Sequence, residues 1–106
     1  MVTTTNKYTP YFPIHPGEIL KDEIEYLGIS QRRLASEMGI SYTLLNEVLN
    51  GKRQVNAELA MLAEAALGLD ADTLVRMQAR YNMQVARQDK TFSERLAKIR
   101  KLTAMR

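Results

Sequence analysis

The 106-residue chain contains no cysteine, which excludes a disulfide framework and a thiolate metal site. It also lacks any apolar run near the roughly 20 residues that a membrane-spanning helix needs. No charged segment followed by an apolar one resembles an export leader. We therefore expect a protein of the reducing cytoplasm that makes no contact with a membrane.

Proline and glycine are scarce, and their positions divide the chain. All three prolines lie within the first 16 residues, which predicts an extended arm over residues 1–15. Four of the five glycines follow apolar segments of helical period, where they are typical helix stops. No segment alternates with the period of a strand. The sequence therefore predicts an all-α fold with helices over about 16–27, 31–38, 42–50, 57–67, 70–89 and 92–104.

The small net charge of +3 is unevenly distributed. Residues 30–55 carry four basic and two acidic side chains, and residues 90–106 carry six basic and one acidic. The two remaining parts of the chain are net acidic. Positive potential is thus concentrated on two segments, where it favours an anionic partner.

The first of these basic segments has the pattern of a helix-turn-helix. Counting from Gln31, the small residue Ala35 is fifth, where two helices can cross closely, and Gly39 is ninth, where the turn needs a positive φ. The apolar positions of the pattern are Leu34, Met38, Ile40, Leu45 and Val48, and the helical spacing of Leu34, Met38, Leu45 and Val48 faces these four inward. The outer face of the second helix is left polar, as in a helix that enters a DNA major groove.

Four segments carry a resemblance to a known family: HPGEIL (15–20), SQRRLASEMGIS (30–41), LLNEVLNGKR (44–53) and LAEAALG (62–68). The chain resembles the HigA-type antitoxins, within the Xre or lambda-repressor-like helix-turn-helix superfamily. The resemblance implies a lambda-repressor-like five-helix domain over 16–89. Residues 90–106 extend beyond it, and their own apolar spacing and basic charge predict an additional amphipathic helix. The resemblance also implies a homodimer that binds operator DNA, neutralises a HigB-type ribonuclease toxin and represses its own operon.

The resemblance carries DNA-binding roles onto the start of the first helix, the outer face of the second and the loop that follows. The position of Gln31 meets a phosphate and braces the second, or recognition, helix. The first turn of that helix lies nearest to base edges, and the loop touches phosphates. The implied DNA-binding residues are Gln31, Arg32, Ser41, Tyr42, Thr43, Asn46, Glu47, Asn50, Lys52 and Arg53.

Two of these residues have a second interpretation. Tyr42 either contacts a sugar or a thymine methyl, or folds back over the preceding helix. Glu47 either accepts from a cytosine amine or pairs with a neighbouring arginine, because a carboxylate facing phosphates costs electrostatic energy. Many relatives have other residues in place of Tyr42, Leu44 and Glu47, so the operator sequence does not carry over. Leu44 and Glu47 are also the hints of a protein-interaction adaptor without DNA binding; a stand-alone repressor without a toxin is the other alternative.

Nothing in the sequence supports an enzyme. His15 has no cluster of partners for a metal or for catalysis, and its place before Pro16 suits a helix N-cap, with Glu18 at the spacing of a capping box. There is no Ser-His-Asp arrangement, phosphate-binding glycine loop or zinc spacing. We expect no enzymatic activity, no metal and no cofactor.

Apolar residues outside the helix-turn-helix predict a further contact surface. Phe92, Leu96, Ile99 and Leu102 recur at helical spacing and should be buried against the core, a second copy or the toxin. We expect burial in the homodimer, through the residues Tyr81, Val85, Phe92, Leu96, Ile99 and Leu102. The aromatic residues of the arm, Tyr8, Tyr11 and Phe12, are expected to dock on their own core rather than on a partner.

Overall fold

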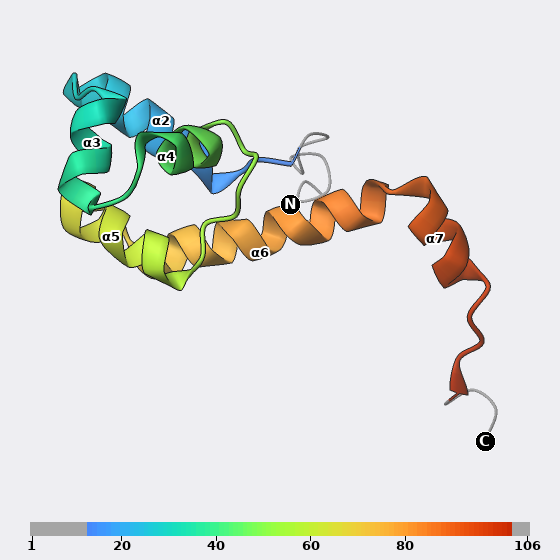
Figure 1. Ribbon diagram of the computed structural model, residues 1–106. Coiled ribbons are helices and arrows are strands. Elements are labelled where there is room, and N and C mark those ends of the chain that lie inside the picture. The colour runs from blue at the N-terminus through green and yellow to red at the C-terminus, as the bar shows by residue number, and fades with distance from the viewer. Residues whose placement is uncertain (1–12, 103–106) are drawn as a thin grey trace, which may run out of the picture.

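The computed structural model describes residues 13–102, which form six helices and no strand (Figure 1). The all-α prediction is confirmed for this part of the chain. The arm predicted over residues 1–15, with Tyr8, Tyr11 and Phe12, lies almost wholly outside the described residues. The helices are α2 (Pro16–Leu27), α3 (Gln31–Met38), α4 (Tyr42–Leu49), α5 (Ala57–Leu67), α6 (Ala71–Gln88) and α7 (Lys90–Ala97).

Short polar side chains begin most of these helices. The hydroxyl of Ser30 accepts the Arg33 N–H at 3.1 Å, and that of Ser41 accepts the Leu44 N–H at 3.0 Å. Such caps bind N–H groups that have no partner within the helix. The predicted cap His15 is confirmed, because its Nδ1 accepts the Gly17 N–H at the start of α2 at 2.9 Å.

One apolar core lies between α2, α3, α4, α5 and the first half of α6. The inward-facing residues predicted for the helix-turn-helix are at most 5% exposed, which confirms the helical pattern: Leu34, Ala35, Met38, Leu45 and Val48. Burying each large aliphatic side chain of this kind contributes about 1.5–3 kcal/mol. The core therefore fixes α3 and α4 relative to each other and to α2.

Helix α2 approaches α4 more closely than a side chain at Gly17 would allow. A Cβ built on Gly17 would overlap the backbone carbonyl oxygen of Val48. Gly17 is buried at the start of α2, and Val48 is buried near the end of α4. The absence of a side chain at Gly17 thus sets the distance between the first helix and the recognition helix.

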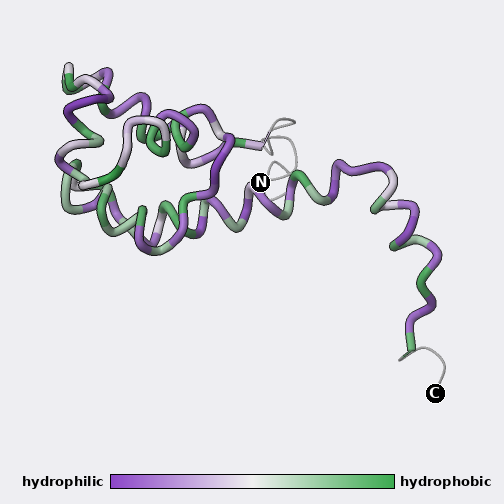
Figure 2. The backbone as a smooth tube through the Cα atoms, in the orientation of Figure 1, coloured by the Kyte–Doolittle hydropathy of each residue, from purple (hydrophilic) through white to green (hydrophobic). Residues whose placement is uncertain are grey.

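Helix α6 runs past the bundle and carries α7 away from the core (Figure 1). Hydrophobic residues are scattered singly between hydrophilic ones along this extension (Figure 2). No residue of α7 is buried, and Phe92 and Leu96 are 40% and 48% exposed. These side chains are therefore not part of the core of a single chain.

The C-terminal helix is shorter than predicted, because α7 ends at Ala97 rather than near residue 104. Ile99 and Leu102 lie beyond it, at 61% and 81% exposed, so they do not continue the stripe of Phe92 and Leu96. The physical reason is that short helices depend on tertiary packing, which α7 receives only weakly in one chain. The prediction of one helix over 90–106 is wrong for the described residues.

Candidate DNA-binding surface

The turn between α3 and α4 has the geometry that the sequence predicts. Gly39 adopts φ +72°, a left-handed conformation that costs glycine little, and its N–H points at the Ala35 and Ser36 carbonyls. Ala35 is 3% exposed. The crossing leaves Ser41, Tyr42 and Thr43 exposed at the start of α4, so this end of the helix presents polar side chains to solvent.

Three amide side chains form a chain of hydrogen bonds across α3 and α4. Asn46 Nδ2 donates to Gln31 Oε1 at 3.0 Å, and Asn50 Nδ2 donates to Asn46 Oδ1 at 3.2 Å. The bracing role of Gln31 is therefore confirmed, whereas its contact with a phosphate stays a prediction. Each amide still has unused donor or acceptor capacity with which to bind another group.

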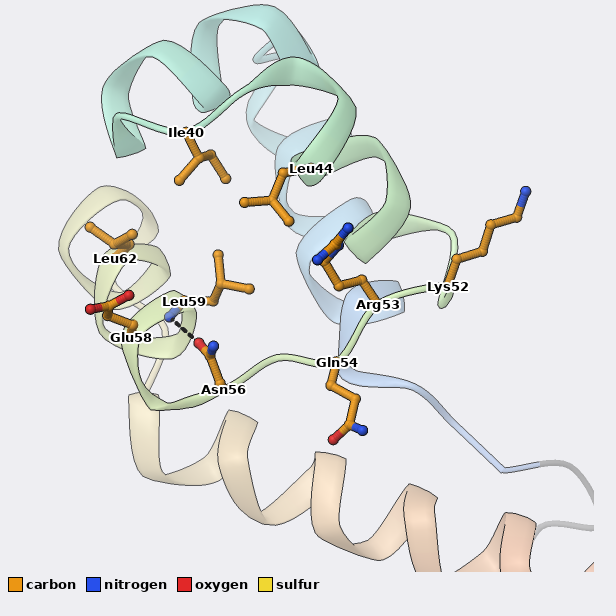
Figure 3. Close-up of a pocket in the computed structure, with 9 residues that line it drawn as sticks. All are labelled: Ile40, Leu44, Lys52, Arg53, Gln54, Asn56, Glu58, Leu59 and Leu62. Carbon is orange, nitrogen blue, oxygen red and sulfur yellow. Dashed lines mark hydrogen bonds between the residues drawn. The ribbon is translucent and has the colours of Figure 1, made fainter.

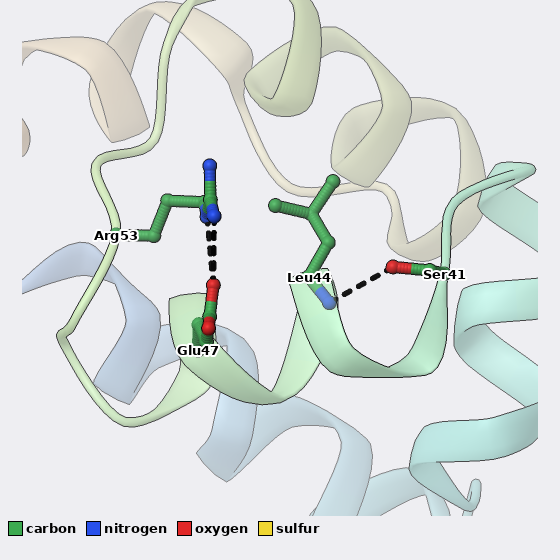
Figure 4. A network of polar contacts seen from close by, with 4 residues as sticks. All are labelled: Ser41, Leu44, Glu47 and Arg53. Atoms are coloured by element: carbon green, nitrogen blue, oxygen red, sulfur yellow. Dashed lines mark hydrogen bonds and ion pairs between the residues drawn. The ribbon is translucent and has the colours of Figure 1, made fainter.

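Glu47 pairs with Arg53, the second of its two interpretations (Figure 4). Arg53 Nε donates to Glu47 Oε1 at 2.9 Å, and a terminal guanidinium nitrogen lies at the same distance from that oxygen. The side chains of Arg53 and Glu47 are 54% and 36% exposed, so the pair contributes at most about 1 kcal/mol. Its main effect is to orient Arg53 along the recognition helix and to neutralise part of its charge.

The Tyr42 side chain packs against Arg32 of α3. The Arg32 guanidinium carbon lies 4.9 Å from the centre of the Tyr42 ring, within cation–π range. The prediction that Tyr42 folds back over the preceding helix is thus confirmed. The ring is still 42% exposed, and it holds the Arg32 charge next to the N-terminus of α4.

A cleft of about 660 Å³ lies between α4 and α5 (Figure 3). Leu44, which departs from the family pattern in the sequence, is one of the residues that line it. Leu44 is only partly exposed and packs against the core. Leu44 and Glu47 therefore both have intramolecular partners, which removes the two hints of an adaptor surface.

His15 contacts the loop after α4, and Tyr81 packs on His15. The two rings meet edge to face at 4.9 Å, and the imidazole also has a hydrogen bond with the Arg53 backbone. Burial lowers the pKa of His15, opposed by that hydrogen bond and by the charge of Glu18. The ring is thus neutral at pH 7 and keeps its Nδ1 as an acceptor. Tyr81, predicted for the dimer interface, is half-buried within its own chain.

Two further residues of α6 hold this loop, and the sequence analysis missed both. Gln78 is 4% exposed, and its Oε1 accepts the Val55 N–H at 2.8 Å. Its Nε2 donates to Asn82 Oδ1 at 3.0 Å, and Asn82 Nδ2 donates to Gln54 Oε1 at 3.2 Å. The signal that could have found Gln78 is its place four residues after Leu74, on the inward face of α6. We call residues 51–55, which these contacts fix, the contact loop.

Elsewhere in residues 13–102 no three side chains among His, Cys, Asp and Glu are grouped as a metal site would require. Over the same range, no helix has both the length and the apolar character needed to cross a membrane.

Comparison with known proteins defines the class of this one. The model of the helix-turn-helix family matches residues 20–74, which contain α3, α4 and the contact loop. The chain therefore belongs to the helix-turn-helix family, with a domain of the Xre-like type. Virulence-associated protein I of Dichelobacter nodosus is 36% identical over 78 residues, which make up 73% of this chain and 72% of that protein.

The solved structures that resemble this chain include HigA-family antitoxins. A HigA-family addiction module antidote protein of Coxiella burnetii has a TM-score of 0.75 and 27% identity, and the match covers 85% of this chain and 98% of that one. The antitoxin HigA of Pseudomonas aeruginosa, solved with the higBA promoter, has a TM-score of 0.76 with the same identity and the same coverage of both chains. The chain thus has the all-α, lambda-repressor-like fold, and its structural neighbours include HigA-family antitoxins.

Proposed function

We propose that this protein is a sequence-specific DNA-binding antitoxin that represses its own operon from the cytoplasm. The observation that carries this proposal is the exposed polar start of α4, with the Arg32 charge held on Tyr42 at that end and Lys52 and Arg53 in the loop that follows the helix. The similarity to an antitoxin HigA solved with its promoter supports it. Within a helix-turn-helix, this end of the recognition helix is the part that fits a major groove.

The geometry supports separate roles for two parts of this surface, base contacts from α4 and phosphate contacts from the residues that follow it. Thr43 and Asn46 lie on the first two turns of α4, from which side chains reach base edges. Asn50, Lys52 and Arg53 follow the end of α4, where they would neutralise or bind phosphates. Gln31 and the capped start of α4 supply further phosphate contacts. A two-fold dimer would read half-sites about one helical turn, roughly 10 bp, apart.

Replacing Arg53 and Thr43 one at a time tests these separate roles in phosphate and base contact. Arg53→Ala should weaken operator and scrambled DNA alike, and should reduce the slope of log Kobs against log salt by about one. Thr43→Ala should instead change the preference at particular bases of the operator, at a cost of roughly 1–3 kcal/mol per affected base pair. Fluorescence anisotropy with DNA from the chain's own promoter measures both effects. Equal wild-type affinity for the promoter and for scrambled DNA would contradict the proposal.

Glu47→Gln is expected to tighten DNA binding, because it removes a negative charge beside the phosphates and releases Arg53 from its ion pair. We expect the affinity for the operator to rise roughly threefold at low salt, and the affinity for scrambled DNA to rise somewhat more. Glu25→Gln, which removes an exposed charge from α2, is the control and should change affinity less. A weaker affinity for Glu47→Gln would show that its carboxylate contacts a base, and an unchanged affinity would show that its charge does not oppose DNA binding.

The second part of the proposed function is the neutralisation of a HigB-type ribonuclease toxin by a homodimer of this chain. Its support is the similarity to HigA-family antitoxins. Co-expression with the neighbouring ribonuclease reading frame should relieve growth arrest and yield a stable complex. Arg53→Ala should neutralise as well as the wild type, because the proposed DNA surface and toxin surface are separate. If the operon contains no toxin gene, the protein would instead be a stand-alone repressor.

A further inference from the structure

The contact loop carries two of the cations proposed to meet phosphates, yet its position is set by a helix outside the helix-turn-helix. Gln78, Tyr81 and Asn82 lie three and four residues apart, on one face of α6. Gln78 accepts the Val55 N–H, and Asn82 donates to the side chain of Gln54. Tyr81 packs on His15, which in turn has a hydrogen bond with the Arg53 backbone. Three neighbouring side chains of α6 thus hold one short loop.

The chemistry at Gln78 indicates a specific role rather than simple filling of the core. A buried amide costs free energy unless its polar atoms are bonded, and an apolar side chain would fill the same space without that cost. Here the Oε1 and the Nε2 of Gln78 both have partners, one in the contact loop and one on Asn82. The pairing fixes the backbone of Val55, two residues after Arg53.

We propose that Gln78, Tyr81 and Asn82 are positioning residues for DNA binding. They hold the contact loop so that Lys52 and Arg53 stand at a fixed place beside α4, and none of them needs to touch the DNA. The inference rests on the proposed DNA-binding function, and it adds that α6 controls the strength of the phosphate contacts.

Asn82→Ala provides the first test, because Asn82 is exposed and its loss should leave the fold intact. Operator affinity is expected to fall about three- to tenfold, since a loosened loop must be ordered again on DNA. The slope of log Kobs against log salt should fall by up to about one, because a phosphate contact is lost. Gln84→Ala, an amide truncation on the same helix, is the matched control and should bind as the wild type does. Wild-type affinity for Asn82→Ala, or a loss without a change of slope, would overturn the proposal.

Amide hydrogen exchange provides a second test that needs no DNA. In Gln78→Met, exchange at Val55 should rise at least about tenfold, while the amides of α3 and α4 keep their protection. Protection of Val55 equal to the wild type would show that α6 does not hold the loop. Circular dichroism checks that Gln78→Met is folded. If it is not, exchange at Gln54 and Val55 in Asn82→Ala shows instead whether α6 holds the contact loop. Failure of the wild type to bind its promoter would refute the proposed function alone, and the exchange result would still decide whether α6 holds the loop.

Discussion

Gly17→Ala is expected to lower the free energy of unfolding by about 3 kcal/mol, because the new methyl group would overlap the Val48 carbonyl oxygen. Alanine is the better helix former, so its propensity alone would predict the opposite sign. The helices α2 and α4 must move apart, and the core between them opens. For a domain of this size, the melting temperature should fall by roughly 12–24 °C. Thermal denaturation followed by circular dichroism measures the change.

Gly28→Ala is the matched control for this prediction. Gly28 has φ +70°, and a Cβ there meets no atom within 4 Å. The substitution therefore costs the strain of a left-handed alanine, about 1–2 kcal/mol, without any clash. If Gly17→Ala melts at the same temperature as Gly28→Ala or above it, the close approach of α2 and α4 is not what stabilises the fold.

Deletion of residues 90–106 is expected to weaken operator binding by about 100-fold or more, because a chain that no longer dimerises binds half-sites one at a time. In a single chain, Val85 and Phe92 are 44% and 40% exposed, and no residue of α7 is buried. A second copy that covers this surface removes that apolar area from water. Sedimentation measures the loss of the dimer, and anisotropy measures the loss of affinity.

The structure changes what this deletion should do to stability. Because no residue of α7 is fully buried in its own chain, its removal should lower the melting temperature mainly at concentrations where the wild type is a dimer. Met61→Ala, which removes an exposed apolar side chain from α5, should leave the dimer intact. A truncated protein that stays dimeric but no longer binds the toxin would make the tail the neutralising element instead.

The helix-turn-helix could be predicted from the sequence because the energies that build it act over short distances along the chain. Ser30 and Ser41 cap helices through N–H groups three residues away. Gly39 supplies a conformation that other residues rarely adopt, and helical periodicity places Leu34 and Val48 in the core. Each of these signals is complete within one or two turns of helix. The family pattern adds the positions that face DNA.

The tertiary structure alone decided which side chains meet across longer separations. Gln78 and Val55 are 23 residues apart, and Asn82 and Gln54 are 28 apart. The spacing of Gln78 from Leu74 places it on the inward face of α6, but nothing local shows that its amide has a partner there, because an amide on a helix is usually solvated. Tyr81 was predicted at a dimer interface from the same apolar pattern that packs it on His15. Periodicity predicts which face of a helix is apolar, but what covers that face depends on how the helices are arranged in space.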